Sequence, residues 1–297
     1  MFNRRRSQVR IKGVMKQVLF LIMAGVLLVG CGANNSEEGV DAKTDGDNVR
    51  KVKVAYVQSS KPITYTDENG EATGYDVEVL KAVDELLPEY EFEFVGTSDD
   101  DLLLGVEQGK YQVGVKNAFF TEERTKKFIY PKEFSGLSST GLLLKKENEH
   151  IKTLEDFASE GLTLAPIAAN NAQYTVIDEY NKENPDNQVK LEAGDTFSVD
   201  VIQWVNEGRV DAGVMIEASV HRQLYDEGAP YHNLKDEVVY NEFAVIKTWP
   251  LFNKEEQELA DAFDEAMKKI KDEKIPNKLS EEFYGKDLFE LLDEAEK

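Results

Sequence analysis

The sequence predicts an α/β protein of two lobes, each with a mostly parallel sheet flanked by helices. Between Lys51 and Val115, segments that alternate apolar and polar residues are interleaved with segments whose apolar residues recur at helical spacing. The same order returns between Leu162 and Val214. Strands that alternate with helices favour a parallel sheet. Two such units of about a hundred residues each suit two separate cores.

The first unit contains a clear series of elements. Lys51–Val57 alternates and predicts a strand, and the Asn-Gly pair at 69–70 predicts a tight turn. Asp76 is the expected cap of a helix that runs to Leu87. Further elements are expected as a strand at 91–95, a short helix at 102–108 and a strand at 113–115.

The second unit repeats this order and ends in a further helix. Its expected elements are a strand at 162–165, a helix at 172–181, a strand at 189–191, a helix at 199–206 and a strand at 212–214. A final helix is predicted over 254–271, because Leu259, Phe263 and Met267 share one face at helical spacing.

The first thirty residues have the features of an export signal. Arginines and lysines precede an apolar run at 18–29, which reads VLFLIMAGVLLV. The run is too short to cross a hydrocarbon core, which needs about 20 apolar residues, but it has the length of a signal-peptide core. The alternative is a short N-terminal anchor that is never cleaved.

A lipid attachment site follows the apolar run. Residues 28–31 read LVGC and resemble the bacterial lipobox, in which the cysteine thiol receives a diacylglycerol and cleavage leaves that cysteine first. We therefore expect 1–30 to be a lipoprotein signal peptide and Cys31 to anchor the protein at the extracytoplasmic face of the cell membrane. Residues 31–50 are polar and predict a flexible tether. Cys31 is the single cysteine, so no disulfide framework is expected.

Charge and missing motifs exclude several classes of function. The net charge is −22, and removal of the cationic signal would take it to −28. Such acidity disfavours binding to nucleic acid or to anionic lipids. His150, His221 and His232 lack metal-ligand spacing, and no P-loop, G-x-G-x-x-G or G-x-S-x-G motif occurs. We expect no catalysis, no cofactor and no metal.

A set of motifs resembles one protein family. Residues 67–78 read DENGEATGYDVE, 102–109 read LLLGVEQG, 120–124 read FTEER and 128–131 read FIYP. IKTLED at 151–156 and EGRVDA at 207–212 follow in the second unit. In order and spacing they are similar to the family 3 extracellular solute-binding proteins, which deliver polar amino acids to ABC importers. The resemblance covers residues 52–288.

The resemblance implies a periplasmic-binding-protein-like clamp that closes on its ligand and is then recognised by a membrane permease. The chain would cross between lobes near 140–146 and return near 238–244. Lobe 1 would comprise 51–143 and 240–297, and lobe 2 would comprise 144–239. The implied ligand is a polar amino acid or derivative, bound by a monomer. The alternatives are an enzyme on the same clamp, of the small-molecule dehydratase type, and a ligand-sensing surface lipoprotein.

The resemblance makes Arg124 the main candidate for ligand binding, since the arginine of the family's TPER motif grips the ligand α-carboxylate. A planar guanidinium offers a carboxylate two parallel donors. The alternative is an arginine on an exposed turn, which Thr121 is expected to cap. Asn117 and Phe119 fall where the family contacts the α-amino group. Phe119 cannot accept a hydrogen bond through its side chain, so it either stacks on the ligand or packs in the core.

Other candidate positions depart from the family pattern. Asn170 and Asn171 replace a Gly-Ser/Thr-Thr turn, and they either offer amide donors to a carboxylate or simply cap a helix. Ile216 stands where many relatives carry an aspartate for the ligand ammonium. Glu217 is then either its substitute after a one-residue shift or an ordinary carboxylate at a helix start. Asp99 either faces the cleft, where it would favour an amino-bearing ligand tail, or begins a solvated helix.

Overall fold

The computed structural model describes residues 49–169, 171–194 and 200–295. The predicted signal peptide, the lipidation site Cys31, all but the last two residues of the tether, and Asn170 lie outside these described residues. Within the described ranges, none of the helices combines the length and the apolar character needed to cross a membrane.

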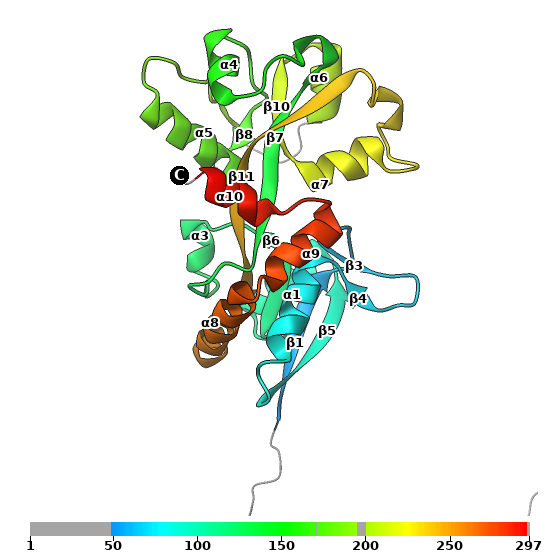
Figure 1. Ribbon diagram of the computed structural model, residues 1–297, viewed down its shortest axis with the longest axis vertical. Coiled ribbons are helices and arrows are strands. Elements are labelled where there is room, and N and C mark those ends of the chain that lie inside the picture. The colour runs from blue at the N-terminus through cyan, green and yellow to red at the C-terminus, as the bar shows by residue number, and fades with distance from the viewer. Residues whose placement is uncertain (1–48, 170, 195–199, 296–297) are drawn as a thin grey trace, which may run out of the picture. The chain divides into compact units, whose positions relative to one another are not determined.

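A six-stranded mixed sheet extends through the described chain in the order β10-β7-β11-β6-β1-β5 (Figure 1). β1 pairs in parallel with β5 and with β6, whereas β11 pairs antiparallel with β6 and β7, and β7 with β10. Its strands are β1 (Arg50–Val57), β5 (Tyr90–Thr97), β6 (Val113–Ala118), β7 (Gly136–Lys145), β10 (Ala212–Ile216) and β11 (Val238–Phe252). The antiparallel pairings all involve β7 or β11.

The first lobe is the part of the fold around β1, β5 and β6. Its core packs Val54 of β1 against Leu80 and Phe263 on the helices, and α1 contacts both α8 and α9. The helices are α1 (Tyr75–Asp84), α2 (Asp99–Glu107), α3 (Glu122–Thr125), α8 (Gln257–Asp272), α9 (Ile275–Tyr284) and α10 (Leu288–Ala295). A small antiparallel sheet joins β2 (Ser59–Ser60), β3 (Thr64–Thr66) and β4 (Ala72–Thr73).

The second lobe surrounds β10 and the far end of β7. Leu142 and Leu144 of β7 belong to one buried cluster and Leu143 to another, because successive strand residues point to opposite faces of a sheet. The helices are α4 (Leu154–Ser159), α5 (Ala172–Glu183), α6 (Val201–Glu207) and α7 (Glu217–Val220). Shorter elements are η1 (Lys146–Asn148), the π-helical turn η2 (His221–Tyr225), η3 (His232–Leu234) and the parallel pair of β8 (Ile167–Ala168) with β9 (Ala193–Gly194).

Two long strands connect the lobes, and they contain the segments expected to cross between them. β7 and β11 pair from Lys145 and Val238 to Gly136 and Thr248, and Figure 1 shows them running from one lobe into the other. The register shifts opposite Gly141, where a Cβ atom would lie 2.4 Å from the Asn241 carbonyl oxygen. The strands therefore approach too closely there for any residue but glycine. The exact lobe boundaries stay a prediction.

Two expectations for the elements of the first lobe need adjustment. Asp76 does not cap α1, which begins at Tyr75 behind Gly74. Instead, Asp76 is buried in the first turn and accepts a hydrogen bond from the Asn117 backbone. The final long helix begins at Gln257 rather than at residue 254, and it carries the expected apolar face into the core.

Two predicted strands of the second lobe are wrong. The segment at 162–165 forms only an isolated parallel bridge, between Leu164 and Ala212. The segment at 189–191 is not a strand, and the parallel pair lies at β8 and β9 instead. β8 and β9 have two residues each, too few for a period-two pattern to appear in the sequence.

Candidate functional site

A cavity of about 290 Å³ brings the two lobes' candidate residues together, and we call it the central cavity. The chain reaches it from β6 and α3 in the first lobe and from α5, β10 and η2 in the second. Its lining is Ser60, Ile63, Lys116, Asn117, Ala118, Phe119, Arg124, Asn171, Ala172, Gln173, Ile216, Ser219 and Arg222. Four of the candidate residues chosen from the sequence therefore line the same cavity: Asn117, Phe119, Arg124 and Asn171.

Arg124 presents its guanidinium to the central cavity from the short helix α3. Thr121 caps this helix as predicted, since its hydroxyl accepts a hydrogen bond from the Arg124 amide at 3.2 Å. Arg124 Nη1 donates to the Phe119 carbonyl at 3.0 Å, and Tyr130 donates to the same oxygen at 2.7 Å. Within the described chain, no carboxylate forms an ion pair with Arg124. Most of its donors therefore remain available to an anion.

Asn117 is held in an unusual backbone conformation at the end of β6. Its φ is 57°, a left-handed value that few residues other than glycine adopt. The Asn117 amide donates to Asp76 Oδ2 at 2.8 Å, and its side-chain Nδ2 donates to Ser138 at 3.1 Å. Burial raises the pKa of Asp76 to about 7, against a lowering by the Asn117 hydrogen bond. A buried carboxyl group thus fixes the backbone that leads to Phe119.

The structure bears on the two residues, Phe119 and Asn171, whose roles the sequence left open. The Phe119 side chain is half-buried at the cavity wall and lies outside the buried clusters of the first lobe. This placement suits stacking on a ligand better than core packing. Asn171 caps α5, because its Oδ1 accepts from the Gln173 amide at 3.0 Å, and it also lines the cavity.

Asp99 is not part of the central cavity. It lies exposed in the first turn of α2, which Ser98 caps, and its carboxylate pairs with Lys116 at 2.5 Å. Lys116 does line the cavity. Burial lowers the pKa of Lys116, and the hydrogen bond that Lys116 donates to Asp99 opposes that effect. Asp99 is therefore the start of a solvated helix, and it neutralises a cavity lysine from outside.

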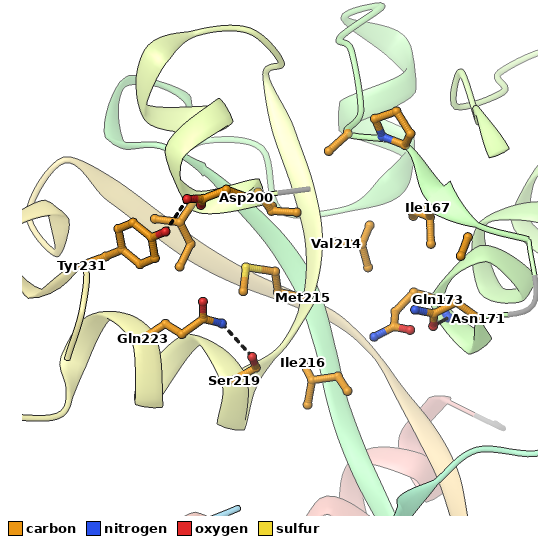
Figure 2. Close-up of a pocket in the computed structure, with 15 residues that line it drawn as sticks. Ile167, Asn171, Gln173, Asp200, Val214, Met215, Ile216, Ser219, Gln223 and Tyr231 are labelled. Carbon is orange, nitrogen blue, oxygen red and sulfur yellow. Dashed lines mark hydrogen bonds between the residues drawn. The ribbon is translucent and has the colours of Figure 1, made fainter. Parts of the chain in front are cut away.

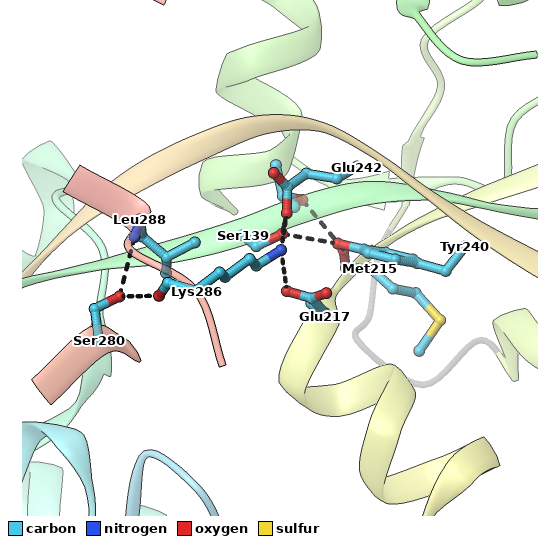
Figure 3. Close-up of polar contacts among 9 residues, drawn as sticks. Ser139, Met215, Glu217, Tyr240, Glu242, Ser280, Lys286 and Leu288 are labelled. Carbon is cyan, nitrogen blue, oxygen red and sulfur yellow. Dashed lines mark hydrogen bonds and ion pairs between the residues drawn. The ribbon is translucent and has the colours of Figure 1, made fainter. Parts of the chain in front are cut away.

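The shift that would let Glu217 replace the family aspartate does not occur. Ile216 lines the central cavity, whereas Glu217 does not. Glu217 pairs with Lys286 at 2.7 Å, and Lys286 also pairs with Glu242 of β11, as the dashed lines in Figure 3 mark. Lys286 lies in the segment between α9 and α10, so the Glu217 carboxylate forms its ion pair with a residue far away in the sequence.

A second cavity of about 480 Å³ adjoins the central one and lies in the second lobe, and we call it the lobe cavity (Figure 2). The two cavities share Asn171, Gln173, Ile216 and Ser219 in their linings. The walls of the lobe cavity are apolar along Ile167, Val214 and Met215, with polar groups on Asp200, Gln223 and Tyr231. A ligand longer than a simple amino acid would find room there.

Three residues of the central cavity were missed from the sequence: Lys116, Gln173 and Arg222. Gln173 is 7% exposed, and its Oε1 has no hydrogen-bond partner in the described part of the chain. Arg222 Nη1 donates to the Lys61 carbonyl at 3.2 Å, so it reaches from the second lobe to the first. None of the three belongs to a recognisable motif. Lys116 and Gln173 lie within two residues of positions already chosen, and Arg222 had no such signal.

Comparison with known proteins identifies the family. Residues 52–286 match the bacterial extracellular solute-binding proteins, family 3. The chain belongs to this family. It is 31% identical to the L-cystine-binding protein TcyJ of Bacillus subtilis, over 91% of this chain and 94% of that protein. It is 27% identical to TcyK, an L-cystine-binding protein of the same organism, over the same shares of the two chains.

A solved structure confirms the predicted clamp fold for this family 3 protein. The probable amino-acid ABC transporter extracellular-binding protein ytmK of Bacillus subtilis aligns with a TM-score of 0.60 and 25% identity. The alignment covers 80% of this chain and 99% of that one.

The family 3 protein's central cavity is rich in hydrogen-bond donors and basic groups. Its lining offers guanidinium, ammonium, amide and hydroxyl groups. Asp76, the carboxyl group whose pKa is raised to about 7, lies behind Asn117 and outside the lining. No group of three or more His, Cys, Asp and Glu side chains that would suit a metal occurs in the ranges described.

Proposed function

We propose that this family 3 protein is the substrate-binding component of an ABC importer and captures a polar amino acid or amino-acid derivative in the central cavity. The observation that carries the proposal is Arg124, a partly buried guanidinium that opens on a cavity with few of its donors used. Such a group binds a carboxylate through two parallel hydrogen bonds. Asn117, Phe119 and Asn171 surround the same space.

L-cystine is the first ligand to test within this class. Two relatives, each aligned over 91% of this chain, carry the name L-cystine-binding protein. Cystine is a long amino acid with a carboxylate at each end, and the adjoining lobe cavity of about 480 Å³ would receive its second half. The central cavity would then hold the end that Arg124 binds.

The protein would bind its substrate without transforming it. Acid–base catalysis needs a titratable group within hydrogen-bond reach of the reacting atoms. Asp76 has a suitable pKa but is separated from the central cavity by Asn117. The relatives are solute-binding proteins as well, so a dehydratase-type activity has no support in the described cavity.

We further propose that Cys31 carries the lipid that holds the protein at the extracytoplasmic face of the cell membrane. The lipobox-like LVGC at 28–31 and the polar tether that follows support this location. Two acyl chains give stable anchoring where one does not. The tether would let a monomer capture its substrate and then dock on the permease.

Titration calorimetry with L-cystine and other amino acids tests the role of Arg124. Arg124→Ala should weaken the best ligand by about tenfold or more, because a charge-assisted hydrogen bond to its carboxylate is lost. Arg124→Lys should restore only part of the affinity, since lysine lacks the planar fork. The matched control is Arg209→Ala, an exposed arginine paired with Glu207 away from the cavity. Equal affinities for Arg124→Ala and the control would refute the assignment.

A further inference from the structure

The central cavity is cationic, although the protein as a whole is strongly acidic. Lys116, Arg124 and Arg222 line it, and no aspartate or glutamate does so among the described residues. The full chain carries 57 acidic and 35 basic residues. A concave site lined by one sign of charge concentrates ions of the opposite sign. The local reversal of charge therefore points to an anionic ligand.

Two of the three basic groups form no ion pair among the described residues, although the Asp226 carboxylate lies near Arg222, where burial lowers the pKa of the guanidinium and Asp226 opposes that effect. Lys116 is already paired with Asp99 at 2.5 Å. Arg124 and Arg222 donate to backbone carbonyl groups, at 3.0 and 3.2 Å, and neither forms an ion pair with a carboxylate within the described chain. A guanidinium has five N–H donors, and a partly buried charge without a partner costs free energy. Each arginine is thus equipped to bind a carboxylate of its own.

The two arginines reach the central cavity from different lobes. Arg124 belongs to α3 in the first lobe, and Arg222 belongs to η2 in the second. One carboxylate satisfies one guanidinium when both of its oxygens are used. Two guanidiniums on separate walls therefore match a ligand with two carboxylates.

The cavity offers the ligand nitrogen a neutral partner rather than a charged one. Ile216, at the position where many relatives carry an aspartate, is apolar, and Glu217 is paired with Lys286. Gln173 Oε1 is a buried acceptor without a partner, and Figure 2 shows the side chain at the wall that the two cavities share. An amide N–H would satisfy this oxygen. Among the described lining residues, no carboxylate is available to balance a free ammonium.

We propose that the central cavity selects amino-acid derivatives with two carboxylates and an acylated α-nitrogen. Arg124 binds one carboxylate, Arg222 binds the other, and Gln173 Oε1 accepts the amide N–H. The acyl group extends into the lobe cavity. This assignment rests on the proposed function and makes Arg222 a specificity-determining residue.

Three probes separate the two requirements in titration calorimetry on the soluble protein. N-acetyl-L-glutamate meets both, N-acetyl-L-glutamine lacks the second carboxylate, and L-glutamate has a free ammonium. We expect N-acetyl-L-glutamate to bind about tenfold or more tightly than either of the others. Arg222→Gln should lower its affinity by a similar factor while lowering that of N-acetyl-L-glutamine much less. Arg222→Lys, which keeps the charge, should retain part of the preference.

The outcomes distinguish this inference from the proposed function. Equal binding of the three probes, or tighter binding of L-glutamate, overturns the inference alone. Equal losses for both acetylated probes in Arg222→Gln, in a variant with an unchanged unfolding midpoint, also overturn it. If neither these probes nor any free amino acid binds the wild-type protein, both the inference and the proposed function fail.

Discussion

At the scale of single residues, the backbone of Asn117 in the wall of the central cavity depends on a carboxyl group that does not line the cavity. Asp76 is 4% exposed and accepts a hydrogen bond from the Asn117 amide at 2.8 Å. Its other oxygen, Oδ1, has no partner in the described chain. Burial therefore raises the pKa of Asp76 to about 7 and favours the protonated form. Asn117 keeps its left-handed φ of 57° through this contact.

Asp76 should make stability depend on pH. An unfolded aspartate has a pKa of about 3.9, so between about pH 4 and pH 7 the folded state holds the proton more firmly. The contribution of Asp76 is then full below about pH 4 and is lost as the pH rises through about 7. Asp76→Asn keeps an acceptor for Asn117 but does not titrate. Its free energy of unfolding, relative to wild type, should rise by up to about 4 kcal/mol between pH 4 and pH 8.

Urea unfolding at several pH values measures this difference. Asp261→Asn, at an exposed carboxylate on α8, is the control and should run parallel to wild type. Parallel curves for Asp76→Asn and wild type would show that Asp76 is not protonated in the folded protein near neutral pH.

At the scale of elements, the segment between α9 and α10 is tied to the strands that join the lobes. Lys286 pairs with Glu217 at the start of α7 and with Glu242 of β11, and Ser139 of β7 contacts Glu242 as well (Figure 3). Burial lowers the pKa of Lys286, but its hydrogen bonds to the two glutamates outweigh that effect. The pKa of Lys286 is therefore raised overall. One lysine thus offsets two carboxylates at the junction of the lobes.

Loss of the Lys286 ammonium should destabilise this junction. Lys286→Met would leave two partly buried carboxylates close together, at a cost of about 1–2 kcal/mol after allowance for solvent screening. Denaturant unfolding measures the effect. Lys268→Met, which removes an exposed pair with Glu265, should cost much less. The double variant Lys286→Met with Glu242→Gln should recover part of the loss, and an additive loss in that variant would contradict the account.

Local sequence patterns located the elements whose residues share one face, and missed those fixed by distant contacts. β1 and α8 were predicted because their apolar residues repeat with the period of a strand and of a helix. Motifs led to Asn117 and Arg124, both in the central cavity. Glu217 is the carboxylate at a helix start that the sequence offered as its alternative role, and its pairing with Lys286, which lies far along the chain, had no local signal. Arg222 lines the cavity from a π-helical turn, and no local sequence pattern predicts such a turn.

At the scale of the whole molecule, a strongly acidic chain contains a cationic cavity, and the lipid proposed at Cys31 would hold that chain at the membrane. The net charge of −22 disfavours electrostatic attachment to anionic surfaces, so the proposed membrane attachment does not rest on electrostatics. The central cavity reverses that charge only where the substrate is to bind. Capture and location are therefore separate properties and can be tested separately.

Replacement of Cys31 should release the protein from the membrane. Cys31→Ala removes the sulfur that would carry the diacylglycerol, and two acyl chains are what gives stable anchoring. Fractionation of producing cells should show the wild-type protein with membranes. The variant should either be free in the medium or periplasm or retain its uncleaved signal. A processed variant that stays with the membrane fraction as fully as wild type would exclude the lipid as the anchor.

A thermal-shift series measures whether the protein captures an amino acid or its derivative. A ligand that binds only the folded state stabilises it by about 2.7 kcal/mol at a hundredfold excess over its Kd. We predict that at least one member of a panel of free amino acids, L-cystine and N-acetylated dicarboxylates raises the unfolding midpoint saturably in wild type but not in Arg124→Ala. A flat response to the whole panel, or the same shift in both proteins, would contradict the account.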